Sequence, residues 1–158
     1  MRRFLQFVGT IVFFGAWIAF WIYFKVGHGR TRVLLINDDR VLVMKQWISA
    51  GKWNLPGGGL HKGEDIKVGA ARELREETSL ELDPRQLRFI GQDVYRKHGH
   101  CFAFSVFIAK VGSDAVRAQR IEVSELAWLR PGELRRRNAS PEVLAALQMA
   151  RDQGVLLQ

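Results

Sequence analysis

Cysteine is nearly absent from this chain of 158 residues, in which Cys101 is the single thiol. One thiol excludes a disulfide within the chain, and it excludes a zinc site built from paired cysteines. A reducing compartment is allowed but not proved. Internal repeats and low-complexity segments are also missing, which excludes a repeat array. The length predicts one domain of ordinary size with room for a short appendage.

Acidic side chains are the scarcer charge, with 16 Asp and Glu residues against 24 Lys and Arg residues and a formal net charge of +8. A basic balance suits three kinds of partner, namely an anionic substrate, nucleic acid or an anionic membrane surface. The net charge alone does not choose among them.

Charge is missing altogether from residues 4–24, where Gln6 is the only strongly polar side chain. A helix of that length is about 31 Å long, close to the ~30 Å hydrocarbon core of a bilayer. Trp21 and Tyr23 stand at its far end, where aromatic rings favour the membrane interface. We therefore expect a transmembrane helix at about 4–24, within a membrane anchor and hinge of residues 1–28. The alternatives are a buried segment of a soluble core and a removed targeting segment.

A glycine-rich loop in the middle of the chain leads into a helix with a dense acidic face. At ~100° per residue, Glu73 and Glu77 lie about 40° apart on that helix, and Glu76 lies about 60° to the other side of Glu73. Like charges so placed destabilise a helix by ~0.2–0.5 kcal/mol per pair, which favours a cation among them. Oxygen ligands in this number suit Mg²⁺ or Mn²⁺. The alternative is a solvated helix whose acids pair with neighbours, such as Glu76 with Arg72.

The opposite stripe of this helix is predicted to pack on the core, because it repeats apolar and small side chains in steps of three and four. The stripe consists of Val68, Ala71, Leu74 and Thr78. In the preceding loop, Gly57, Gly58 and Gly59 allow close approach of the backbone. Their carbonyl and amide groups can therefore point at a metal or a phosphate.

The spacing of these residues forms a longer pattern. Counting from Gly58, the chain has Gly, five residues, Glu64, seven residues, Arg-Glu-Leu, one residue, Glu-Glu, one residue and Ser-Leu, ending at Leu80. This resembles the Nudix box, whose family pattern is Gly-x5-Glu-x7-Arg-Glu-U-x-Glu-Glu-x-Gly-U with U an aliphatic residue. One position departs, because Ser79 stands where the family has glycine. A serine in the left-handed conformation expected there costs ~1 kcal/mol, so the departure bears on stability more than on chemistry.

The elements predicted around the box come in the order strand, strand, box helix, strands and terminal helix. Apolar and β-branched runs between turn residues predict the strands. They fall at 31–36, 41–45, 87–95, 101–111 and before residue 129. Ser140 and Pro141 predict the start of the terminal helix. This order indicates a mixed α/β (α+β) fold, and the resemblance implies an α/β/α sandwich around a mixed β-sheet. We assign residues 29–158 to this Nudix hydrolase domain.

The resemblance also implies a metal site at the box, holding Mg²⁺ (or Mn²⁺) that bridges the diphosphate oxygens of the substrate. The expected metal ligands are Glu73, Glu76, Glu77 and the carbonyl of Gly58. Glu64 would add a ligand through water, and Arg72 would orient a box carboxylate rather than touch substrate. A metal-bound or carboxylate-activated water would then attack phosphorus, with the general base left unassigned.

Candidate substrate-binding residues surround the box. The backbones of Gly57 and Gly59 border the expected phosphate site. Trp53, like Trp47, offers a ring for stacking on a base, with packing beside the loop as the alternative. Tyr95 lies where some Nudix enzymes that cleave dinucleoside polyphosphates carry a tyrosine, and a role in the sheet explains it equally well.

The resemblance thus implies a metal-dependent hydrolase that cleaves the diphosphate linkage of a nucleoside diphosphate joined to another group. The expected anchor would tether it to a membrane as a single-pass protein, with a cytosolic domain because nucleotides and Mg²⁺ are available there. The alternatives are a hydrolase of a lipid-linked diphosphate and a non-catalytic nucleotide-binding module that regulates a membrane partner. The expected partners are a small nucleotide-type substrate and a membrane, with no specific nucleic acid and with a homodimer left open.

Overall fold

The computed structural model describes residues 29–47, 49–97, 100–112, 116–117 and 123–155. Its strands are β1 (Arg30–Asn37), β2 (Arg40–Gln46), β3 (Arg88–Lys97), β4 (His100–Lys110) and β5 (Val123–Leu129). Its helices are α2 (Ile66–Thr78), the short α3 (Pro131–Leu134) and α4 (Pro141–Asp152), with a 3-10 turn, η1, at Pro84–Gln86.

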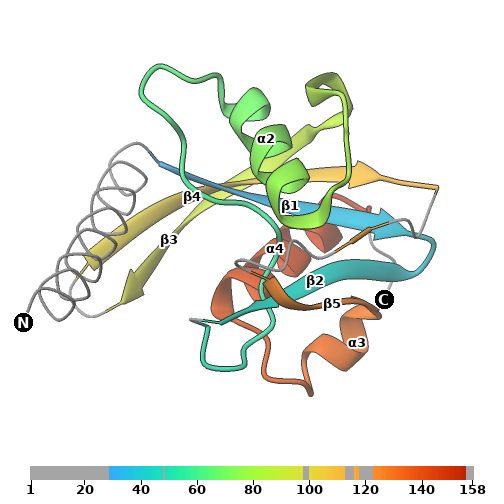
Figure 1. Ribbon diagram of the computed structural model, residues 1–158. Coiled ribbons are helices and arrows are strands. Elements are labelled where there is room, and N and C mark those ends of the chain that lie inside the picture. Colours follow the sequence, from blue (N-terminus) through green and yellow to red (C-terminus); the bar gives the residue numbers. More distant parts are fainter. Residues whose placement is uncertain (1–28, 48, 98–99, 113–115, 118–122, 156–158) are drawn as a thin grey trace, which may run out of the picture.

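The strands form one mixed sheet in the order β3-β4-β1-β2-β5. β1 pairs parallel to β4, and the other neighbours pair antiparallel. Figure 1 shows α2 and α4 on opposite faces of this sheet. The mixed α/β fold predicted from the element order is confirmed, as is the hairpin of the first two strands.

The central strand β1 is buried along nearly its whole length because it is covered on both faces, and its apolar side chains occupy positions 33–36. Leu34 and Ile36 belong to the buried cluster under α4, whereas Val33 and Leu35 belong to the cluster under α2. These four side chains are at most 3% exposed. The alternation places β1 at the middle of a three-layered molecule.

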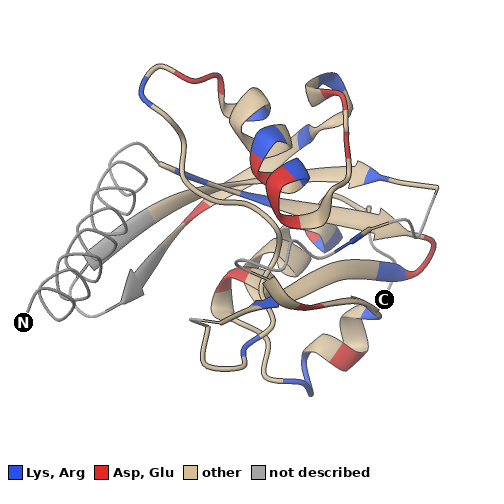
Figure 2. Ribbon diagram, viewed as in Figure 1, with Lys and Arg blue, Asp and Glu red and all other residues tan. Residues whose placement is uncertain are grey.

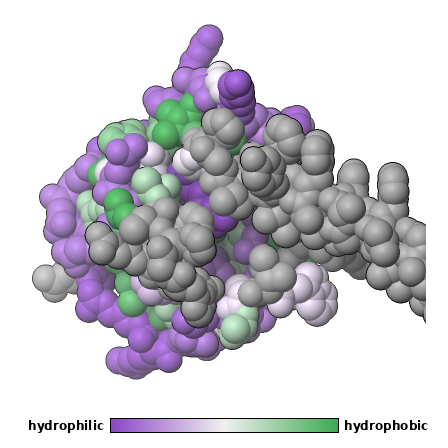
Figure 3. Space-filling model, turned by 90° about the vertical axis from the view of Figure 1, so that its left-hand side faces the viewer, coloured by the Kyte–Doolittle hydropathy of each residue, from purple (hydrophilic) through white to green (hydrophobic). Residues whose placement is uncertain are grey.

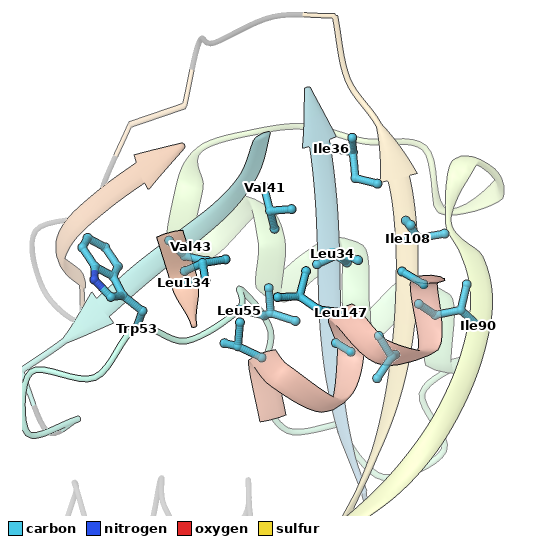
Figure 4. Packing of buried hydrophobic residues seen from close by; sticks show 14 of the residues in the cluster. Leu34, Ile36, Val41, Val43, Trp53, Leu55, Ile90, Ile108, Leu134 and Leu147 are labelled. Atoms are coloured by element: carbon cyan, nitrogen blue, oxygen red, sulfur yellow. The ribbon is translucent and has the colours of Figure 1, made fainter. Parts of the chain in front are cut away.

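The cluster on the α4 side combines side chains of the sheet, the loop after β2 and both C-terminal helices (Figure 4). α4 contributes its buried stripe, which is Val143, Ala146, Leu147 and Ala150. The helix starts where the sequence predicted, since the Ser140 side chain accepts a hydrogen bond from the Val143 N–H and Pro141 follows the cap. A hydroxyl cap and a proline in the first turn satisfy the unpaired N–H groups of the helix start.

On the α2 side, Ala70, Ala71 and Leu74 of the helix pack against side chains of the sheet that include Phe107 of β4. Val68, which was predicted to join them, is 48% exposed, so that part of the predicted packing stripe is wrong. The reason is geometric, because successive steps of three residues drift around a helix and place Val68 about 120° away from Leu74. The buried face is instead centred on Ala70 and Leu74.

No helix in the described ranges is long and apolar enough to cross a membrane. The expected localisation as a single-pass membrane protein is corrected on this finding. The segment at 4–24 on which that expectation rested lies outside the described residues, together with the rest of 1–28. The division of the chain after residue 28 stays a prediction.

Apolar side chains at the surface are scattered. On the face shown in Figure 3, hydrophilic residues form most of the rim and apolar residues form small separate patches. Among the residues that the structure describes, the large exposed apolar ones are Trp47, Val68, Phe89, Val94 and Leu144. Single exposed apolar residues are normal on a soluble domain, so this pattern by itself does not indicate an interface.

Candidate active site

The box helix α2 has a defined cap at each end. The carboxylate of Asp65 accepts hydrogen bonds from the N–H groups of Lys67 (2.9 Å) and Val68 (3.1 Å). At the other end Ser79 adopts the left-handed conformation, with φ 57° and ψ 13°, and its N–H donates to the Arg75 carbonyl. The structure therefore places Ser79 in the backbone conformation expected for the family glycine.

The loop before α2, residues 55–65 and hereafter the box loop, runs beside β1. The Thr31 N–H donates to the Gly58 carbonyl (2.9 Å), and the Val33 N–H donates to the Pro56 carbonyl (2.8 Å). At Gly57, φ is +131° and an added Cβ would lie 2.3 Å from the Thr31 carbonyl oxygen. An added Cβ at Gly58 would lie 2.3 Å from a carboxylate oxygen of Glu73. Both glycines are thus required by close packing of the loop between β1 and α2.

Glu73 and Glu77 are almost fully buried, at 2% and 3% exposure. One oxygen of Glu77 accepts a hydrogen bond from the Gly57 N–H (2.7 Å), and the other accepts from Nε2 of Gln46 (3.1 Å). Glu73 accepts from Nη1 of Arg72 (2.8 Å). Buried carboxylates are costly unless cations or hydrogen bonds compensate them, so two of them under one glycine loop indicate a functional site.

Arg72 holds the remaining box carboxylates in place. Its guanidinium makes two hydrogen bonds to Glu64, at 2.8 and 3.0 Å, and Nη2 also donates to the Gly59 carbonyl (3.1 Å). Nη1 reaches both oxygens of Glu76 at 3.4 Å. The hydrogen bonds from Arg72 lower the pKa of Glu64 to about 2, and Glu64 in turn raises the pKa of Arg72. Figure 2 shows that acidic and basic residues follow one another along α2.

The donor set fits a hard divalent cation, although the three box carboxylates do not converge. In the ranges described above, no group of three or more His, Cys, Asp or Glu side chains could hold a metal. The Glu76 side chain is 41% exposed and turns to Arg72, whereas Glu73 is buried beside Gly58 and Glu77 is buried beside Gly57. Because Mg²⁺ binds proteins through one or two carboxylates and keeps several waters, two buried carboxylates and a carbonyl are a suitable donor set.

The aromatic candidates differ in their exposure and in their place in the fold. Trp53 is 4% exposed and belongs to the cluster on the α4 side, with Nζ of Lys45 4.3 Å from its ring centroid, which favours the packing interpretation. Trp47 is 72% exposed. Tyr95 lies in the edge strand β3, where it pairs with Phe102 of β4.

Three residues at the site were missed by the sequence analysis, namely Gln46, Arg32 and Glu142. Gln46 contacts Glu77, and Arg32 donates to the Gly57 carbonyl and to Glu142 of α4. Arg32 carried a usable signal, because an arginine directly before the apolar run of a strand must find partners when buried. Glu142 carried none, because an acidic residue in the first turn of a helix is an ordinary feature.

Comparisons with known proteins bear on the family of the chain. A family model described as NUDIX domain matches residues 27–148. A "MutT-like protein" of Streptomyces ambofaciens is 32% identical over 107 residues, which are 68% of this chain and 66% of that protein. An "Oxidized purine nucleoside triphosphate hydrolase" of Mus musculus is 46% identical over 55 residues, which are 34% of this chain and 35% of that protein. The chain thus spans less than two thirds of the length of these relatives.

Solved structures show the same fold. The NUDIX domain of Shewanella oneidensis NrtR, complexed with ADP ribose, superposes with a TM-score of 0.68 at 20% identity and covers 83% of this chain and 90% of that chain. Identity this low supports the fold alone. The match of the family model over residues 27–148 supplies the family, and the chain therefore belongs to the Nudix hydrolase family, as the box predicted.

Proposed function

We propose that the chain is a metal-dependent hydrolase that cleaves the diphosphate linkage of a nucleoside diphosphate joined to another group. The observation that carries this proposal is the pair of carboxylates, Glu73 and Glu77, buried at 2% and 3% exposure against the glycines of the box loop. A solvated structural helix has no reason to bury two acids beside the glycines of a loop.

Glu73, Glu77 and the Gly58 carbonyl would hold Mg²⁺ (or Mn²⁺), and Glu76 would join them or bind through water. The bound ion supplies neutralisation of the negative charge that develops on the diphosphate oxygens. Arg72 keeps Glu64 ionised, and its hydrogen bonds fix the orientation of both Glu64 and Glu73. The burial of Glu73 and Glu77 keeps bulk water from competing for their oxygens.

The proposed substrate class follows from the site and from the relatives. The names of two similar proteins refer to an oxidised purine nucleoside triphosphate and to ADP ribose, both of which contain a nucleoside diphosphate. The basic balance of the chain, +8 overall, favours such anionic substrates electrostatically.

Turnover by the full-length chain tests the proposal. Release of phosphate or nucleotide products would be followed for nucleoside triphosphates, ADP ribose, nucleotide sugars and dinucleoside polyphosphates, with and without Mg²⁺ or Mn²⁺. We expect turnover of at least one class of substrate, and a chelator should abolish it. Glu77→Gln should lower kcat at least ~100-fold, because the mutation of a residue that only supports a metal ligand already costs 10–100-fold in activity or metal affinity.

The matched control is Glu81→Gln, which makes the same chemical change at an exposed residue just after the box. Its kcat should equal that of the wild type. If the folded wild-type chain binds nucleotide and Mn²⁺ but turns over no member of the panel, the hydrolase proposal fails and a nucleotide-binding module takes its place.

A further inference from the structure

A continuous series of hydrogen bonds connects the helix on one face of the sheet to the box helix on the other. Arg32 of β1 donates through Nε to Glu142 of α4, and through Nη1 to the Gly57 carbonyl (2.8 Å). The Gly57 N–H then donates to Glu77 of α2 (2.7 Å). Gln46 of β2 completes the series by donating to the second oxygen of Glu77.

The charged side chains in this series are buried, so each of them depends on its partner. Arg32 is 8% exposed, and the side chains of Arg32 and Glu142 are 10% and 14% exposed. Charges at such depth persist only when they are paired and hydrogen-bonded, and removal of one partner leaves the other uncompensated. The planar guanidinium also suits the position, because it presents several donors in fixed directions, here to Glu142, Gly57 and the Thr31 carbonyl.

The backbone of Gly57 has little freedom of its own. Glycine adopts its φ of +131° readily, whereas other residues rarely do, and contact with Thr31 leaves no room for a side chain. Arg32 holds the carbonyl of this residue while Glu77 accepts from its N–H. The direction of the N–H that orients Glu77 is therefore coupled to the position of the Arg32 guanidinium.

We propose that Arg32, held by Glu142, is a positioning residue that fixes Gly57 and, through its N–H, the carboxylate of Glu77. Both residues lie outside the box, so the site depends on a helix on the far face of the sheet. This inference rests on the proposed function for its effect on turnover, whereas its effect on the carboxylate is independent of turnover.

The test compares Arg32→Met with Arg32→Lys in the full-length chain. Methionine keeps an apolar stem and removes the guanidinium, while lysine restores the charge without the fork of donors. The measurements are kcat, the substrate KM, the half-saturating Mn²⁺ concentration and the amide chemical shift of Gly57. Arg32→Met should lower kcat or Mn²⁺ affinity at least about tenfold, move the Gly57 amide resonance and leave KM unchanged. Arg32→Lys should recover part of each change.

The matched control is Arg130→Met, which breaks the exposed pair of Arg130 with Asp39 on the far edge of the sheet. It should leave all four quantities at wild-type values. If Arg32→Met proves unstable, Glu142→Gln keeps an acceptor for Arg32 but removes the charge, and it should change the same quantities in the same direction by less.

The inference is overturned if these variants lower thermal stability while kcat, Mn²⁺ affinity and the Gly57 resonance stay at wild-type values, since Arg32 would then be only structural. If the wild type turns over no substrate, the proposed function fails by itself. A loss of Mn²⁺ affinity and a shifted Gly57 resonance in Arg32→Met would then still support the positioning role.

Discussion

Among single residues, Ser79 at the end of the box helix has a side chain that conflicts with its backbone conformation. It ends α2 in the left-handed conformation, where glycine has no steric penalty and other residues do. We expect Ser79→Gly to raise the free energy of unfolding by about 1 kcal/mol, measured by urea denaturation. Ser79→Ala is the control, because alanine keeps the strain. Equal stability of the two variants would contradict the explanation.

Glu64 links the stability of the site to pH. Its pKa is lowered to about 2 by the hydrogen bonds from Arg72, so the ionised form stabilises the folded state. This contribution is complete above the unfolded pKa of about 4.3 and is lost as the pH falls toward about 2. We expect the wild type to exceed Glu64→Gln in unfolding free energy near pH 7, with the difference shrinking below about pH 4.5. A difference that is constant down to about pH 2 would disprove this linkage.

At the scale of an element, α4 offers a direct test of which face packs. Leu147 is 2% exposed within the cluster of Figure 4, whereas Leu144, one turn earlier, is 42% exposed. Leu147→Ala should lower the free energy of unfolding by about 2–5 kcal/mol, because it removes buried methyl groups and leaves a cavity. Leu144→Ala should stay within about 0.5 kcal/mol of the wild type. Thermal and urea unfolding would measure both, and similar losses would mean that the buried face of α4 is wrongly placed.

The elements themselves were largely readable in the sequence. The hairpin, the box helix and the capped terminal helix follow from local signals, namely turn residues, helix periodicity and the Ser140-Pro141 start. The error at Val68 arose because steps of three residues drift around a helix, so the stripe read from the sequence did not give the centre of the buried face.

For the whole molecule, the site lies where three layers meet. The parallel pairing of β1 with β4 places β1 in the centre of the sheet, so that the box loop can lie beside it while α2 and α4 cover its two faces. Such pairing joins segments some seventy residues apart in the chain, a relation that no local pattern encodes. The contacts of Arg32 with Gly57 and Glu142 exist only because this arrangement brings the three elements together.

The sequence by itself determined the family, the mixed α/β fold, the box helix and its acidic stripe, since these depend on residue spacing along a helix and a loop. The tertiary structure decided which acids are buried, because burial of Glu73 and Glu77 and exposure of Glu76 depend on the box loop and β1. It likewise moved Trp53 from a candidate binding surface into the core. Burial is a property of what packs against a residue, and those partners are distant in sequence.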